Sequence, residues 1–108
     1  MASTTISRGN VNLNLALGVT LTPTALTAST TTSQTFTVPG LQLLDIVMVN
    51  FNGAQTAGVG IVNAYVSALN TLTIVFNNAT AGTPTPAAGL YVMTVHRPEY
   101  VPLPTNAF

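Results

Sequence analysis

The chain has 108 residues, the length of one small domain. Only 4% of the residues are charged, against about 25% in an average soluble protein, and the formal net charge is zero. Two arginines cannot form the basic stripe that nucleic-acid phosphates require, so we expect no nucleic-acid partner. The absence of cysteine excludes disulfides, thiolate nucleophiles and cysteine-ligated metals.

The chain opens with residues that show no periodicity. Residues 1–10 are small and polar, include Arg8, and lack the apolar run of a signal peptide, so they predict a flexible N-terminal arm. No stretch reaches the roughly 18 uninterrupted apolar residues of a membrane helix, and we expect no membrane partner.

Apolar residues then occupy every second position from 11 to 21. This alternation predicts a half-buried strand, or two strands bent at Gly18, which Pro23 ends. Residues 24–33 predict a loop or a weak edge strand, and residues 34–38 predict a short strand. Pro39 and Gly40 form a turn signal.

Four further strands are predicted at residues 43–51, 58–68, 71–76 and 89–96. Asn52-Gly53 predicts a hairpin after the first of them, and Leu69-Asn70 predicts a tight turn after the second. Residues 77–88 predict a loop. The sum of about seven strands without a helix predicts an antiparallel β-sandwich or small barrel over residues 11–96.

The last segment, residues 97–108, is rich in proline and predicts an extended C-terminal arm, because three prolines fit neither a helix nor a central strand. Its apolar side chains are Tyr100, Val101, Leu103 and Phe108. Spaced apolar residues have little reason to exist at a frayed terminus. We therefore expect this arm to lie across a partner or to add a strand to its sheet.

Ionisable side chains gather where the last strand meets this arm. His96, Arg97 and Glu99 are three of the five charged or histidine side chains of the sequence. They predict either a polar contact at a subunit interface or a solvated strand end with an Arg–Glu pair. The candidate interface residues are therefore Arg8, His96, Arg97, Glu99, Tyr100, Leu103 and Phe108.

The sequence holds no recognisable catalytic or metal-binding constellation. No G-x-S-x-G motif and no metal-ligand spacing surrounds His96, Asp45 or Glu99, so we predict no enzyme, no cofactor and no metal. Asp45 follows a turn, which predicts hydrogen bonds to the loop that it leaves; if it is buried, it needs backbone N–H groups or an arginine. The glycosylation sequon at residues 78–80 is discounted, since no secretion signal is visible.

The shortage of charge itself points to assembly. Soluble monomers carry charge on about 25–35% of their surface, and β proteins often protect edge strands with lysine, which this chain lacks. We therefore expect a subunit of a larger assembly, with itself as one partner in a homodimer or homotrimer. The alternative is that hydroxyls and amides keep a monomer soluble.

Two stretches resemble a pattern found in small virion proteins of tailed bacteriophages: FTVPGLQLLDIVMVN, and AGVGIVNAYVSALNTLTIVFNNATAGTPTPAAGLYVMTVHRP. The matching features are the V-P-G turn, the V-S-A-x-N-T-L-T-I strand pair, the F-x-N-x-T loop and the P-x-x-G-x-Y entry to the last strand. They span about residues 35–98.

The resemblance implies a capsid decoration, or cement, protein with a jelly-roll-like β-sandwich of seven to eight strands, the eighth hidden in residues 24–32. Such a protein binds the outer capsid surface of the virion, after assembly in the host cytoplasm, and bridges major capsid proteins. The alternatives are a tail, neck or fibre component, and a carbohydrate-binding attachment module that stacks sugars on Tyr65, Tyr91 or Tyr100.

Overall fold

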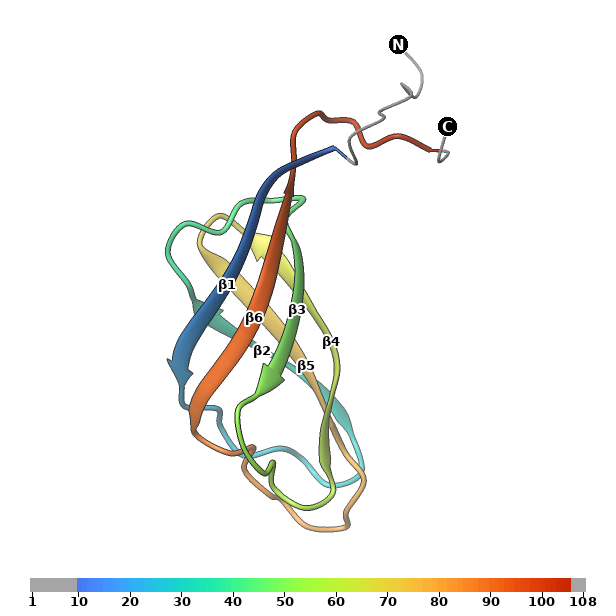
Figure 1. Ribbon diagram of the computed structural model, residues 1–108. Helices are drawn as coiled ribbons and strands as arrows, with labels where there is room; N and C mark the ends of the chain where they lie inside the picture. Colours follow the sequence, from blue (N-terminus) through green and yellow to red (C-terminus); the bar gives the residue numbers. More distant parts are fainter. Residues whose placement is uncertain (1–9, 106–108) are drawn as a thin grey trace.

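The computed structural model describes residues 10–105, and these residues form six strands and no helix. The strands are β1 (Val11–Leu21), β2 (Thr31–Thr37), β3 (Ile46–Phe51), β4 (Val59–Ala68), β5 (Thr71–Asn78) and β6 (Gly89–Pro98). They form two antiparallel three-stranded sheets, β1-β6-β3 and β2-β5-β4, named here the β6 sheet and the β5 sheet after their central strands. Figure 1 shows the two sheets as stacked layers. The all-β, sandwich-like prediction is confirmed, but the count of seven to eight strands is wrong.

The two central strands supply half of the buried apolar core. The fully or almost fully buried hydrophobic side chains on them are Leu72, Ile74, Phe76, Tyr91, Met93 and Val95. Because alternate residues of a strand point to one face, the three on β5 and the three on β6 each face the opposite sheet. Burying each such side chain contributes roughly 1.5–3 kcal/mol. At one end of this core the rings of Phe51 and Tyr91 lie 4.9 Å apart, centroid to centroid.

The alternation of residues 11–21 corresponds to one continuous strand, β1, which pairs with β6. Leu17 and Val19 pack against the core and Leu21 is buried, which confirms the half-buried prediction. Gly18 does not bend the strand. A Cβ at this position would lie 3.1 Å from the side chain of Leu90, so a small residue leaves room for that leucine.

Two strands begin three residues away from the predicted start. β2 begins at Thr31, three residues before the predicted start, because Thr31 to Ser33 pair with Asn77 to Val75 of β5. No strand forms in residues 22–30, so the described chain has no eighth strand there. β3 begins only at Ile46, because the backbone turns at Leu44, whose φ is 72°.

The hairpin predicted at Asn52-Gly53 is wrong. β3 pairs with β6 and β4 pairs with β5, so residues 52–58 cross from one sheet to the other. The backbone N–H of Asn52 donates to the carbonyl of Leu90, which keeps the chain on β6 past the end of β3. The turn at Leu69-Asn70 is confirmed. It joins β4 to β5, and Asn70 has a φ of 61°, a conformation that asparagine tolerates.

β1 begins and β6 ends at the same end of the sandwich, where residues 99–105, named here the tail, leave it (Figure 1). β6 reaches Pro98, two residues beyond the predicted end of the last strand. The pairing of β6 with β3 stops at His96 opposite Ile46. Pro98 therefore lies beyond β3, where its missing N–H removes no bond to that strand.

Candidate interaction surfaces

Arg97 and Asp45 form an ion pair inside the chain. The Arg97 Nε lies 2.8 Å from Asp45 Oδ1, and its Nη2 lies 2.9 Å from Asp45 Oδ2. The Asp45 side chain is completely buried, whereas that of Arg97 is 22% exposed. Asp45 Oδ2 also accepts from the Gln42 backbone N–H, and Arg97 Nη2 donates to the Gly40 carbonyl. Both sources of partners expected for a buried Asp45, the preceding loop and an arginine, are present.

The ion pair shifts the pKa values of both of its partners. Hydrogen bonds from Arg97 lower the pKa of Asp45 below its ordinary value, against the opposing effect of burial. The same hydrogen bonds raise the pKa of Arg97. Both groups therefore stay ionised at neutral pH and neutralise each other. Arg97, predicted as an interface residue, uses its charge within the fold.

Asn10 clamps the tail beside the start of β1. Its side-chain Nδ2 donates to the Tyr100 carbonyl (3.1 Å), and its Oδ1 accepts from the Tyr100 N–H (2.7 Å). The Asn10 carbonyl accepts from the Glu99 N–H at 3.0 Å. Asn10 is buried and has a φ of 56°, which asparagine adopts more readily than most residues. Sequence reasoning placed Asn10 in a flexible arm and missed this clamp.

The tail beyond the clamp presents apolar side chains to solvent. Tyr100, Val101 and Leu103 are all exposed. Glu99 is also exposed, and His96 is half-buried on the outer face of the β6 sheet. Arg8 and Phe108 lie outside the described residues.

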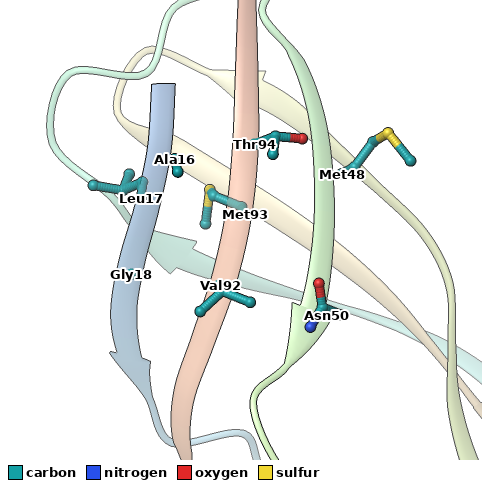
Figure 2. Close-up of a pocket in the computed structure, with 8 residues that line it drawn as sticks. All are labelled: Ala16, Leu17, Gly18, Met48, Asn50, Val92, Met93 and Thr94. Atoms are coloured by element: carbon teal, nitrogen blue, oxygen red, sulfur yellow. The ribbon is translucent and has the colours of Figure 1, made fainter. Parts of the chain in front are cut away.

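The outer face of the β6 sheet carries a shallow hollow of about 580 Å³. Cross-strand register places Ala16, Thr94 and Met48 in one row of this face. Gly18, Val92 and Asn50 form the next row. Figure 2 shows these side chains on β1, β6 and β3. The small side chains of β1 leave the hollow open, and no side chain lining it is charged.

Exposed apolar side chains extend this surface along the sheet. Met48 is 68% exposed and Ile46 is 54% exposed, and Leu90 is exposed on the neighbouring β6. We name the hollow together with these side chains the apolar face. Exposed apolar patches are characteristic of interaction sites.

The outer face of the β5 sheet is chemically different. Alternate residues of β2 present hydroxyl groups to solvent: Thr31, Ser33, Thr35 and Thr37. Tyr65 on β4 pairs opposite Thr73 on this sheet and is 45% exposed. Of the three tyrosines weighed for sugar stacking, Tyr91 is fully buried, and its hydroxyl donates to the Ala87 carbonyl. Tyr91 is therefore not available to stack on a ligand.

The sequon asparagine, Asn78, is buried and saturated with hydrogen bonds. Its Nδ2 donates to the Thr27 and Gly82 carbonyls, and its Oδ1 accepts from the backbone N–H and the hydroxyl of Thr80. The amide nitrogen that would carry a glycan is committed to two internal bonds. Asn78 is thus a structural residue that ties two loops to the end of β5.

The chain matches no protein-family model, and no curated protein or solved structure matches it. Within residues 10–105, no helix is long and apolar enough to cross a membrane. In the same part of the chain, His, Asp and Glu side chains do not gather into a group of three that could hold a metal ion.

Proposed function

We propose that the chain is a structural virion protein that binds the outer surface of a bacteriophage capsid and bridges major capsid proteins. In this proposal the apolar face contacts the shell, and the tail reaches a neighbouring shell subunit. The resemblance implies a jelly-roll-like plan, of which two three-stranded sheets would be a reduced version.

The observation that carries the proposal is an exposed sheet face with almost no charge around it. Of the four charged side chains in the sequence, Asp45 and Arg97 neutralise each other within the fold. A free monomer normally relies on surface charge to remain dispersed. A face such as that around Met48 and Ile46 is better suited to permanent contact with another protein.

In this proposal each copy stabilises the shell by making more than one contact with it. When the apolar face is bound, the tail, held by the clamp at Asn10, is presented to the adjacent subunit at high effective concentration. Many modest contacts repeated over a shell would then oppose the outward pressure of packaged DNA.

Retention on purified particles at increasing salt tests the proposal. Since the apolar face offers little charge to screen, attachment should be nearly the same at low and high ionic strength. Release by moderate salt would contradict this account of the interface.

Two lysine variants then test which face binds. Met48→Lys places a charge on the apolar face at an exposed position and should reduce occupancy on particles. Ser33→Lys, on the outer face of the other sheet, is the matched control and should bind normally. Equal occupancy of the two variants would exclude the apolar face as the contact.

A further inference from the structure

The two sheets differ in how their edges are protected. Along β2, the Gln34 side chain accepts from the Thr24 N–H and donates to the Thr24 carbonyl, which holds residue 24 beside that strand. On the opposite side of the sandwich β3 lies against β4, and β4 has two irregular positions that interrupt its pairing. Covered or irregular edges of this kind prevent strand-to-strand association.

β1 has no comparable protection. It is the longest strand, with 11 residues, and it pairs with β6 on one side only. In residues 10–105, no backbone hydrogen bond joins its other edge to another segment. β1 contains no charged residue and no proline. Its single irregularity lies between Val11 and Leu13, and the register from Leu13 to Leu21 is unbroken.

The exposure pattern of β1 identifies one position on this edge. Leu13, Leu15, Leu17, Val19 and Leu21 share the inner face of the strand. Leu15 is 42% exposed, whereas Leu17 and Val19 pack on the core and Leu21 is buried. Leu15 is thus the residue of this set that the sandwich itself leaves open to solvent.

An antiparallel second copy of β1 fits this edge. When two such strands are related by a two-fold axis at Leu15, each residue pairs with one of the same face, because the side-chain period is two. Leu15 then lies opposite Leu15 of the second copy, and Leu13 lies opposite Leu17 of the second copy. On the outer face Asn14 lies opposite Ala16 of the second copy. Every pair is uncharged, and the central pairs on the inner face are leucine opposite leucine.

We propose that the free edge of β1 pairs antiparallel with β1 of a second copy, centred on Leu15, and joins two β6 sheets into one six-stranded sheet. The two apolar faces would then form one continuous surface. A single strand pair falls in the smallest class of protein interfaces, below about 1,200 Å², so the pair is weak in dilute solution. This pairing rests on the proposed function, because copies bound side by side on a shell would supply the high local concentration that a weak pair needs.

Cysteine cross-linking of the purified full chain tests the pairing, because the natural sequence has no cysteine. Directly opposed cross-strand residues have Cβ atoms about 4.5–5.5 Å apart, within reach of a short thiol cross-linker. Leu15→Cys should give several-fold more covalent dimer than Leu69→Cys, a control at a 66% exposed turn position. Equal yields from the two variants would overturn the proposal.

A charge variant provides an independent measurement. In the proposed pair, Leu15→Lys sets two ammonium groups against each other and should weaken self-association by about tenfold or more. Sedimentation velocity measures it at high protein concentration, because the pair is weak in dilute solution. Leu69→Lys should not change it. An unchanged association constant for Leu15→Lys, with the fold retained by circular dichroism, would overturn the proposal.

Both measurements use the isolated chain, so their failure would leave the virion role intact. Conversely, absence of the chain from particles would contradict the virion role without affecting a cross-link at position 15. If Leu15→Lys reduces particle binding while Leu15→Cys gives no dimer, the occupant of the edge is a strand of the shell protein, and the second-copy pairing is wrong.

Discussion

Replacing Asp45 by Asn should destabilise the fold, because it breaks the ion pair that the buried carboxylate forms with Arg97. The substitution keeps the shape of the side chain but removes its negative charge. It also replaces one acceptor oxygen with an NH₂ group, which would face N–H donors from Arg97 or Gln42.

The expected loss of stability depends on how well water can hydrate Arg97 once its negatively charged partner is gone. Removing one partner of a buried ion pair costs about 3–5 kcal/mol. Arg97 is 22% exposed, so water can partly hydrate the unpaired guanidinium and the loss should be near the lower limit. We therefore expect a decrease of about 3 kcal/mol in the free energy of unfolding. For a domain of this size that corresponds to a drop of about 12 °C in Tm.

The pH dependence gives a second signature. Because the pKa of Asp45 is lowered in the folded state, the pair contributes its stability above the ordinary value of 3.8 and loses it as the pH falls further. The free energy of unfolding of the natural chain should therefore decrease in this acidic range. That of Asp45→Asn should vary less.

The assay is urea unfolding followed by far-UV circular dichroism at pH 7 and through the acidic range. Glu99→Gln removes the same charge from the other carboxylate, which is exposed, and should change stability by less than about 1 kcal/mol. If Asp45→Asn is as stable as Glu99→Gln, the reasoning about the buried pair is wrong.

Three further substitutions test local packing through the urea midpoint, with an unchanged m value expected. Asn78→Ala removes four hydrogen bonds at a buried site and should cost about 2–4 kcal/mol; a cost below about 1 kcal/mol would mean that water replaces them. Gly58→Ala should cost about 2 kcal/mol, because φ is 78° and the new Cβ would collide with the Thr80 side chain; a neutral result would show that the turn relaxes. Tyr91→Phe leaves Gln55 and the Ala87 carbonyl without their hydroxyl partner and should cost about 1–2 kcal/mol, whereas a stabilised variant would contradict the role of this bond.

The strands with one covered face were the easiest to predict. The alternation of β1 is visible because one side of the strand faces the core and the other faces solvent. The turn at Leu69-Asn70 was also predictable, since its geometry depends on two neighbouring residues. Both features are local in sequence.

Pairing between distant strands could not be predicted in the same way. Asn52-Gly53 is a local turn signal, but the partner of β3 is β6, about 40 residues further along the chain. The choice between β4 and β6 depends on how the whole sandwich closes, and no local pattern encodes it.

The same limit applies to the candidate surfaces. The sequence indicated that a buried Asp45 needs backbone N–H groups or an arginine, but not that Arg97, 52 residues away, is one of its partners. The clamp between Asn10 and Tyr100 spans 90 residues. In contrast, the shortage of charge, which supports the proposed assembly, is a property of composition and was visible at once.

The most direct test of the proposed function is the copy number of this chain in gradient-purified virus particles, measured by quantitative mass spectrometry against the major shell protein. A decoration protein should be present in hundreds of copies, in a simple ratio to the shell subunit. A handful of copies would place it in the tail, neck or fibre, and complete absence would contradict a virion role.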